Sequence, residues 1–198
     1  MSKKVKIRGP VVVCSASSAA SWMLSTKRGH SVKGVLSIAD LHNMHRSRPS
    51  GLNFVPFKTY LTFDDVVSWS DPGAPTLEDA QRILTFADRF KSYFDHDPRE
   101  PHYDDEAVLG RPRVLIHCYA GQCRSTAAAV AAYAYALGPG REHDAVQFAA
   151  LSAEQAVADD PCFLPSRFVL EHVDTLLDRK GALVRAASSF SLAALLAA

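Results

Sequence analysis

One segment of the chain reads Val114-Leu115-Ile116-His117-Cys118-Tyr119-Ala120-Gly121-Gln122-Cys123-Arg124-Ser125-Thr126, and the fold can be inferred outward from it. Its first residues form a mostly apolar run of strand length, which predicts a buried strand that ends near Cys118. An alanine-rich stretch from Arg124 to Leu137 follows and is stopped by Gly138-Pro139-Gly140, which predicts a helix. The residues around Gly121 are therefore expected to form a tight loop that leads from a buried strand into a helix.

The rest of the chain alternates between strand-like and helix-like segments. Apolar or β-branched runs of strand length occupy Val11–Cys14, Val35–Ile38 and Phe57–Phe63. A helix-like stretch, with Ser15, Ser17 or Ser18 as N-cap, separates the first two runs, and two more helices are expected at about 142–158 and 166–179. Strands that alternate with helices predict an α/β fold with a central, mostly parallel sheet flanked by helices.

A further helix is predicted directly after Pro75. Thr76 is its expected N-cap and Asp79 stands in the position of a capping-box partner. Apolar residues at helical spacing give it one hydrophobic face: Leu77, Ile83, Leu84, Ala87, Phe90 and Phe94. Residues 95–112 contain three prolines and six acids, so we expect a long acidic loop between this helix and the strand at Val114.

Length and composition place the chain among ordinary globular proteins. The 198 residues are expected to form a single domain, 1–198, with an apolar C-terminal tail at 188–198 that docks on the body or frays. A hydrophobic content of 47% and a charged content of 22% exclude a disordered or fibrous protein. No apolar run approaches the roughly 20 residues that a membrane span needs, and the N-terminal run is too short for a signal-peptide core. Four cysteines do not indicate a disulfide scaffold, so we expect a cytoplasmic chain with reduced thiols.

The loop around Gly121 has the chemistry of an anion site. A tight loop at the start of a helix directs several backbone N–H groups inward, and the positive end of the helix dipole lies behind them. Arg124 adds a planar fork that matches two phosphate oxygens. A cysteine at the centre of such a loop is expected to be a thiolate. His117 can orient the loop by hydrogen bonds, and Ser125 or Thr126 can assist the sulfur as a leaving group.

This combination, His117-Cys118, five residues, then Arg124-Ser125, resembles the signature of the cysteine-dependent protein tyrosine phosphatase superfamily. The small chain is most similar to the dual-specificity-like branch and to compact bacterial proteins that resemble tyrosine phosphatases. The resemblance implies Cys118 as nucleophile, Arg124 as the phosphate clamp and Ser125 as helper of the departing thiolate. It also implies a phosphate loop made by the backbone amides of Tyr119, Ala120, Gly121, Gln122, Cys123 and Arg124.

Phosphoryl transfer also needs an acid that protonates the leaving oxygen. In the superfamily this acid is an aspartate on a loop upstream of the signature. Asp64 and Asp65 follow the predicted strand at 57–63, and parallel strands would bring them to the same edge of the sheet as Cys118. We expect Asp65 to be the acid, ahead of Asp64 and then Asp71. Asp104 and Asp105, in the long acidic loop, are outside alternatives.

The remaining cysteines are given simpler roles. Cys123 is read either as a small loop residue or as a resolving thiol that traps oxidised Cys118 in a disulfide, as its similar position in the low-molecular-weight tyrosine phosphatases implies. Cys14 and Cys162 are expected to be buried apolar residues. No metal or other cofactor is implied, because the phosphate loop and Arg124 already neutralise a phosphate.

The sequence thus predicts a metal-independent phosphomonoester hydrolase with a cysteinyl-phosphate intermediate. Phosphotyrosine in proteins is the leading substrate by family resemblance, for a tyrosine or dual-specificity phosphatase. Residues 1–58 carry ten Lys/Arg and one acid, which would also suit RNA 5′ ends, phosphoinositides or another polyanion. Two other classes remain open, namely a phosphate-binding module without turnover and a thiol-based reductase that uses Cys118 with Cys123.

Overall fold

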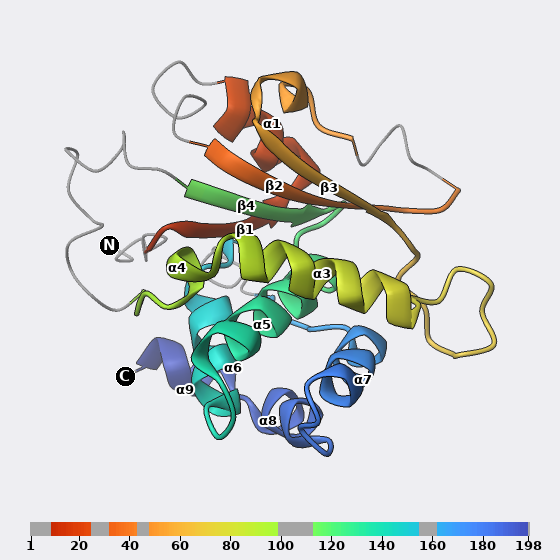
Figure 1. The fold of residues 1–198 in the computed structure, drawn as a ribbon, viewed down its shortest axis with the longest axis vertical. Helices are drawn as coiled ribbons and strands as arrows, with labels where there is room; N and C mark the ends of the chain where they lie inside the picture. The colour runs from red at the N-terminus through yellow and green to blue at the C-terminus, as the bar shows by residue number, and fades with distance from the viewer. Residues whose placement is uncertain (1–8, 25–31, 43–47, 99–112, 155–161, 198) are drawn as a thin grey trace.

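A four-stranded sheet lies at the centre of the molecule, with every strand parallel to its neighbours (Figure 1). The computed structural model describes residues 9–24, 32–42, 48–98, 113–154 and 162–197. The strand order is β1-β4-β2-β3, and the strands are β1 (Val11–Ser15), β2 (Val32–Ala39), β3 (Phe57–Thr62) and β4 (Arg113–Cys118). The predicted α/β fold with a parallel sheet is confirmed.

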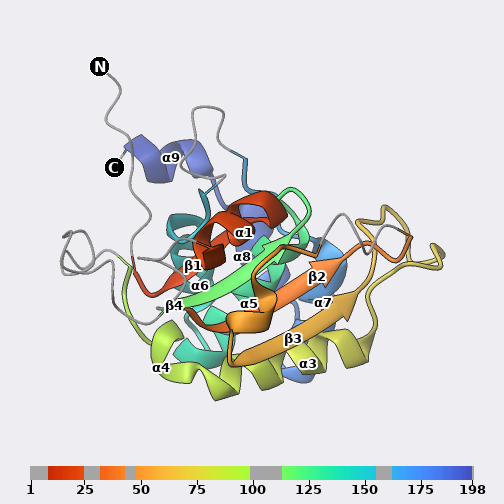
Figure 2. The same cartoon turned by 90° about the horizontal axis from the view of Figure 1, so that it is seen from above.

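Helices cover both faces of the sheet, as expected when parallel strands are joined by crossovers. One face carries α1 (Ala16–Leu24) and the short 3₁₀ turn η2 (Leu52–Phe54), which Figure 2 shows above the strands. The other face carries the larger helical layer. That layer consists of α3 (Leu77–Arg89), α4 (Lys91–Phe94), α5 (Arg124–Leu137), α6 (Glu142–Leu151), α7 (Arg167–Leu176), α8 (Ala182–Ser189) and α9 (Leu192–Ala197).

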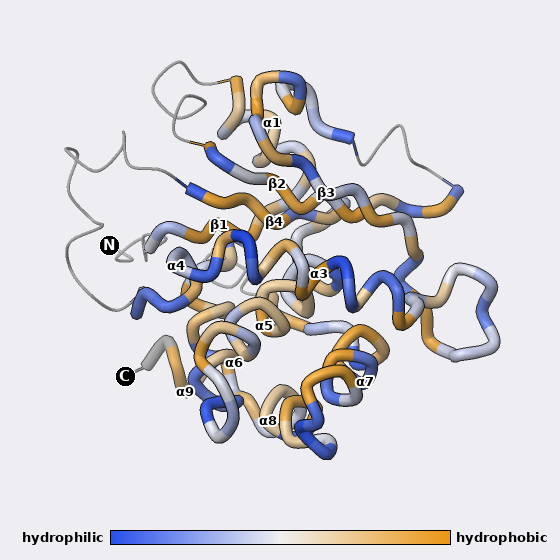
Figure 3. Tube along the Cα trace, in the orientation of Figure 1, coloured by the Kyte–Doolittle hydropathy of each residue, from blue (hydrophilic) through white to orange (hydrophobic). Residues whose placement is uncertain are grey.

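The pleat of each strand divides its side chains between two hydrophobic cores. In β1, Val11 and Val13 face the larger helical layer, whereas Val12 and Cys14 face α1. All four are fully buried, which explains why the sequence shows continuous apolar runs rather than alternation. Figure 3 shows hydrophobic colour along these strands and hydrophilic turns on the outer side of α3. Each large aliphatic side chain buried in this way contributes roughly 1.5–3 kcal/mol.

Helix α5 is the centre of the larger layer and has the predicted bounds. Its residues from Arg124 to Ala134 are all buried, between the sheet and helices α3, α6 and α7. Alanine side chains allow neighbouring helices to pack closely on several sides, since interaxial distance follows side-chain size. The helix ends at Gly138, whose φ of 83° is the left-handed conformation that glycine adopts without strain.

The helix predicted after Pro75 begins as expected but differs in two details. The Asp79 N–H donates to the Thr76 hydroxyl at 3.2 Å and the Thr76 N–H to the Asp79 carboxylate at 2.9 Å, so the capping box is confirmed. Leu77, however, is 46% exposed, and its assignment to the buried face was wrong because a first-turn residue projects past the sheet. The helix also stops at Arg89 and restarts as α4, so the apolar face is shared between two helices.

Other boundaries shift by a few residues. The helix expected at 142–158 is α6, which ends at Leu151, and the one expected at 166–179 is α7. The C-terminal tail docks on the body: Phe190, Leu192 and Leu195 are partly buried against the larger core. Within the described residues, none of the helices is long and apolar enough to span a bilayer.

Candidate active site

The carboxyl ends of the parallel strands bring the predicted site residues to one edge of the sheet. Cys118 is the last residue of β4, Asp40 follows β2, and Asp64 and Asp65 come shortly after β3. Open parallel sheets bind ligands at this edge. The order β1-β4-β2-β3 places the cysteine on an inner strand, next to the strand that leads to Asp40.

The loop from Tyr119 to Cys123 connects β4 to α5 and rests directly on the end of β1. Gly121 has a φ of 78°, and a Cβ atom there would lie 2.6 Å from the backbone of Cys14 and Ser15. The Tyr119 carbonyl accepts a hydrogen bond from the Ala16 N–H at 3.2 Å. Glycine is therefore required at position 121 both by its φ and by the space available.

Cys118 lies at the bottom of this loop and is 2% exposed. Its Sγ accepts a hydrogen bond from the Gly121 N–H at 3.2 Å, and the Ser125 hydroxyl lies at 3.2 Å from the same sulfur. The N-terminus of the fourteen-residue helix α5 follows immediately. The Gly121 amide, the Ser125 hydroxyl and the N-terminal end of α5 thus all lie close to the Cys118 sulfur.

Arg124 is 5% exposed, and its guanidinium is held by two fixed acceptors. Nη1 donates to the Phe63 carbonyl at 2.9 Å and lies 2.6 Å from the Asp40 carboxylate. Its Nε is buried and has no hydrogen-bond partner among the described residues, which leaves a donor for a bound anion. Sequence reasoning missed Asp40: it is a single acid after a strand, and no spacing rule relates it to Arg124.

Three candidates for the general acid, Asp64, Asp65 and Asp71, lie in the part of the chain that the structure describes, and their environments differ. Asp65 is exposed and accepts a hydrogen bond from the Cys123 thiol at 2.9 Å, which places it at the phosphate loop. Asp64 accepts instead from the Leu41 N–H at 2.8 Å. Asp71 accepts from the Ser68 N–H within its own loop. Asp104 and Asp105 lie outside the described residues.

His117 is fully buried beneath the loop. Burial lowers the pKa of His117 to about 4, against a smaller opposing effect of the Cys118 backbone, so the ring is neutral at physiological pH. Neither ring nitrogen makes a hydrogen bond of standard geometry to a described residue. The expectation that His117 orients the loop through hydrogen bonds stays a prediction, and the described residues show it packed beneath the loop.

All four cysteines are free. Cys14 is fully buried, which raises the pKa of its thiol, and it belongs to the core on the opposite side of the sheet from Cys118. Cys123 is half-buried. Burial and, next, the hydrogen bond to Asp65 raise the pKa of Cys123 well above its ordinary value, so this side chain is a thiol. Cys162 is also half-buried rather than buried as expected.

Two further segments lie beside the phosphate loop, and the sequence did not identify either of them as part of the site. The stretch before α7 donates to the phosphate loop, from the Leu164 N–H to the Gln122 carbonyl at 3.0 Å and from the Ser166 N–H to the Cys123 carbonyl at 3.3 Å. The loop after Asp65 is anchored to α7 by Trp69. The indole ring lies edge-on to Phe168 and His172, with centroids 4.7 and 4.8 Å apart.

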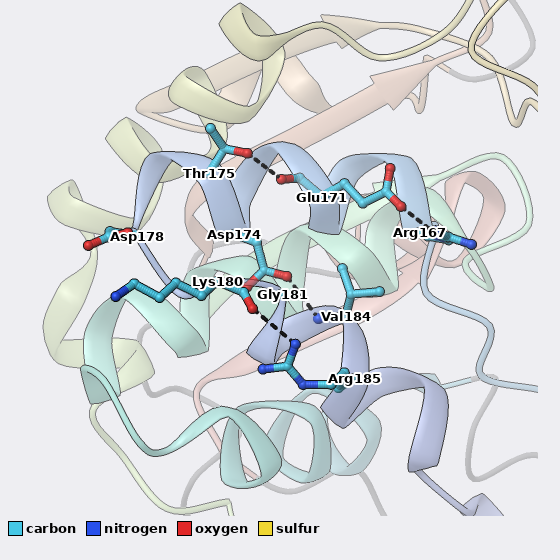
Figure 4. A pocket seen from close by; sticks show the side chains of 9 residues that line it. All are labelled: Arg167, Glu171, Asp174, Thr175, Asp178, Lys180, Gly181, Val184 and Arg185. Atoms are coloured by element: carbon cyan, nitrogen blue, oxygen red, sulfur yellow. Dashed lines mark hydrogen bonds and ion pairs between the residues drawn. The ribbon is translucent and has the colours of Figure 1, made fainter.

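A pocket of about 540 Å³ lies between α7 and α8, apart from Cys118 (Figure 4). Four of its charged side chains, those of Arg167, Glu171, Asp174 and Arg185, are engaged with each other or with backbone. Arg167 pairs with Glu171, and Arg185 donates to the Lys180 carbonyl. Asp174 accepts from the first N–H groups of α8, at Leu183 and Val184, and so serves as a structural cap. Within the described residues, no group of three or more His, Cys, Asp or Glu is arranged to hold a metal ion.

Comparison with known proteins gives a structural rather than a sequence relationship. No protein-family model matches this sequence, and no curated protein matches it significantly. PTPMT1, solved in complex with PI(5)P, is similar in structure with a TM-score of 0.52 and 16% identity, over 93% of this chain and 98% of that one. The human tyrosine phosphatase-like serine/threonine/tyrosine-interacting protein has a TM-score of 0.47 and 16% identity, over 84% of this chain and 90% of that one. This chain therefore shares its fold with PTPMT1, and the segment from His117 to Ser125 lies at the end of its inner strand β4.

Proposed function

We propose that this protein is a metal-independent phosphomonoester hydrolase that acts through a cysteinyl-phosphate intermediate. The observation that carries the proposal is the arrangement around Cys118: its sulfur lies 3.2 Å from both the Gly121 amide and the Ser125 hydroxyl, at the start of α5. Arg124 is fixed beside it by Asp40 and the Phe63 carbonyl. A buried thiolate beside a rigid guanidinium is suited to attack on a phosphate dianion, whose charge the loop amides and Arg124 neutralise.

In the first step the Cys118 thiolate attacks phosphorus in line with the leaving oxygen. The S–P bond forms as the P–O bond to the leaving group breaks, and Asp65 gives its proton to the departing oxygen. The equatorial phosphate oxygens lie among the amides of Tyr119 to Arg124. Because Arg124 presents a planar fork, it can follow these oxygens into the transition state, where their charge is largest.

In the second step water attacks the phosphorus of the intermediate. The Asp65 carboxylate takes a proton from that water, the S–P bond breaks, and inorganic phosphate is released. The Ser125 hydroxyl donates to the sulfur as it regains negative charge, which makes the thiolate a better leaving group. Both Cys118 and Asp65 return to their starting protonation states, so no further reactant is needed.

The surroundings of the loop favour an organic phosphate with an apolar part, and phosphotyrosine in a protein is the leading candidate. Exposed apolar side chains stand on segments in contact with the site: Leu41, Val67, Tyr119 and Leu164. An aromatic leaving group can pack against such side chains, whereas free phosphate cannot. Tyr119 directly follows the proposed nucleophile and is 52% exposed, which suits contact with a substrate ring.

A polyanionic phosphate ester is the second candidate. Residues 1–58 carry a net charge of +9, and the similar structure of PTPMT1 was solved with PI(5)P. A strong decrease of kcat/KM with added salt would favour this substrate class, because screening weakens long-range attraction.

Hydrolysis of p-nitrophenyl phosphate, with a chelator present and no reductant cycling, tests the proposal. Wild type should turn over, Cys118→Ser should not, and Cys162→Ala should match wild type, since Cys162 lies outside the site. Cys118→Ser should still bind phosphate, because an alcohol is a poor nucleophile but leaves the loop in place. An inactive wild type that binds phosphate would instead indicate a binding module. Dependence on added thiol would indicate a reductase.

A further inference from the structure

The hydrogen bond between Cys123 and Asp65 joins the phosphate loop to the loop that bears the proposed acid. These two residues come from the start of α5 and from the segment after β3. We propose that Cys123 is a positioning residue for the general acid: its thiol donates to Asp65 and holds this carboxyl group beside the phosphate loop. The inference rests on the proposed hydrolase function. It adds the contact between Cys123 and Asp65, which the signature motif does not specify.

The backbone of Cys123 is held by several hydrogen bonds, so the direction of its Cα–Cβ bond is fixed. Its carbonyl accepts from the Ala127 N–H at 3.0 Å, the Ser166 N–H at 3.3 Å and the Thr126 hydroxyl at 2.7 Å. These contacts come from α5 itself and from the segment before α7. A side chain on such a support can orient a partner, as a second layer of contacts does in preorganised sites.

Asp65, by contrast, has little else to hold it. It is exposed, and within the part of the chain that the structure describes, Cys123 is the hydrogen-bond partner of its side chain. The adjacent Asp64 is turned the other way, toward the Leu41 N–H, and anchors the start of the loop there. Without the thiol, the Asp65 carboxyl group would be free to rotate toward solvent.

The surrounding charges define how this contact should respond to pH. Cys118 and Arg124 are the other ionisable groups that act on Cys123, and Arg124 is already paired with Asp40. Because burial keeps Cys123 protonated, it remains a donor across the working range of pH. The contact with Asp65 should therefore persist across that range, and replacing the thiol by a group that cannot donate removes it at every pH.

Kinetics of Cys123→Ala and Cys123→Ser test this role, with phenyl phosphate as the poor leaving group and p-nitrophenyl phosphate as the good one. Cys123→Ala should lower kcat for phenyl phosphate by about 3- to 10-fold, as expected for the loss of one modest hydrogen bond. The effect on p-nitrophenyl phosphate should be smaller, because its leaving group hardly needs a proton. Cys123→Ser retains a donor and should recover most of the loss.

The same substitution in an Asp65→Asn background decides whether Cys123 acts through Asp65. Cys123→Ala should add no further loss there, because the acid is already gone. An additive loss, or an equal loss on both substrates, would assign Cys123 to the phosphate loop alone and overturn the inference. Absence of aryl phosphate turnover in wild type would refute the hydrolase function itself, whereas an active wild type with an unchanged Cys123→Ala would refute only this role.

Discussion

Arg124 reaches its position through contacts that no local motif contains. Its Nη1 lies against the Asp40 carboxylate and the Phe63 carbonyl, which belong to the segments after β2 and β3. We therefore expect Arg124→Lys to lower kcat by about 10²–10³-fold, because a single ammonium group cannot replace the fork in the transition state. Asp40→Asn should cause a smaller loss, since it loosens the guanidinium without removing it. Steady-state kinetics with an aryl phosphate measure both, and a larger loss in Asp40→Asn would contradict this order.

Among the candidate acids in the described residues, Asp65 is the one whose carboxylate accepts a hydrogen bond from the phosphate loop. Asp65→Ala should slow hydrolysis by about 10²–10⁴-fold for poor leaving groups, the usual range for general acid catalysis. The loss should shrink for p-nitrophenyl phosphate, whose leaving group hardly needs a proton.

Asp64→Ala serves as the matched comparison. Its carboxylate accepts from the Leu41 N–H and is so close to Gly73 that a Cβ there would lie 2.3 Å from Oδ2. Its removal should disturb the loop and lower the rates for both leaving groups alike. If Asp64→Ala showed the leaving-group dependence and Asp65→Ala did not, the acid would be Asp64.

Oxidation of Cys118 tests separately whether Cys123 can act as a resolving thiol. Peroxide that enters the site would convert Cys118 to sulfenic acid with release of water, and condensation with the Cys123 thiol would release a second water and form a disulfide. Because the Cys123 thiol is directed at Asp65, it must rotate away from that acid first. Mass spectrometry without reductant should show a Cys118–Cys123 link, and dithiothreitol should restore activity. Cys123→Ser should be inactivated irreversibly, and equal recovery of the two proteins would exclude a resolving role.

At the scale of the elements, the phosphate loop depends on how closely it approaches β1. A methyl group at Gly121 would meet the backbone at Cys14 and Ser15 at 2.6 Å, and a φ of 78° is unfavourable for alanine. Gly121→Ala should therefore displace the loop, remove the donor to Cys118 and abolish turnover, while the protein stays folded but less stable by about 1–3 kcal/mol. Aryl phosphate assays and urea unfolding measure the two effects. Full activity in this variant would show that the loop does not need this approach.

Local signals accounted for most of the elements. The bounds of α5 follow from an alanine run that ends at a glycine, and the start of α3 follows from the Thr76–Asp79 capping box. The parallel sheet followed from the alternation of buried runs and helices. Leu77 shows the limit of periodicity: it fits the apolar face by spacing, yet in the first turn it lies beyond the sheet and is exposed.

The site could be predicted where its residues are adjacent in sequence or follow neighbouring parallel strands, as Asp65 does. Cys118, Gly121 and Arg124 lie in one segment, so their common role could be read directly. Asp40 could not be found, since its contact with Arg124 arises from the order β1-β4-β2-β3, which places β2 beside β4. The contact of Trp69 with α7 and that of Cys123 with Asp65 likewise depend on tertiary packing.

At the scale of the whole molecule, a buried histidine lies beneath the site, and it lowers the free energy of unfolding at acidic pH. His117 is fully enclosed at the end of β4, beneath the loop, and burial lowers its pKa from 6.5 to about 4. The folded protein therefore binds the His117 proton more weakly than the unfolded chain does. Stability from this group is complete above about pH 6.5 and is lost as the pH falls toward 4, because in that window the unfolded chain gains a proton that the folded state excludes.

This difference in pKa corresponds to about 3 kcal/mol of unfolding free energy between pH 7.5 and pH 4, on the scale of about 1.4 kcal/mol for each pH unit. His117→Asn retains a polar side chain of similar size but cannot titrate. Between pH 7.5 and pH 4 its unfolding free energy should therefore fall by about 3 kcal/mol less than that of the wild type. Urea unfolding of both proteins at pH 7.5, 5.5 and 4 measures the difference, and the comparison removes the contribution of the shared carboxylates. Parallel stability curves for the two proteins would mean that His117 takes up its proton in the folded state as readily as in the unfolded one.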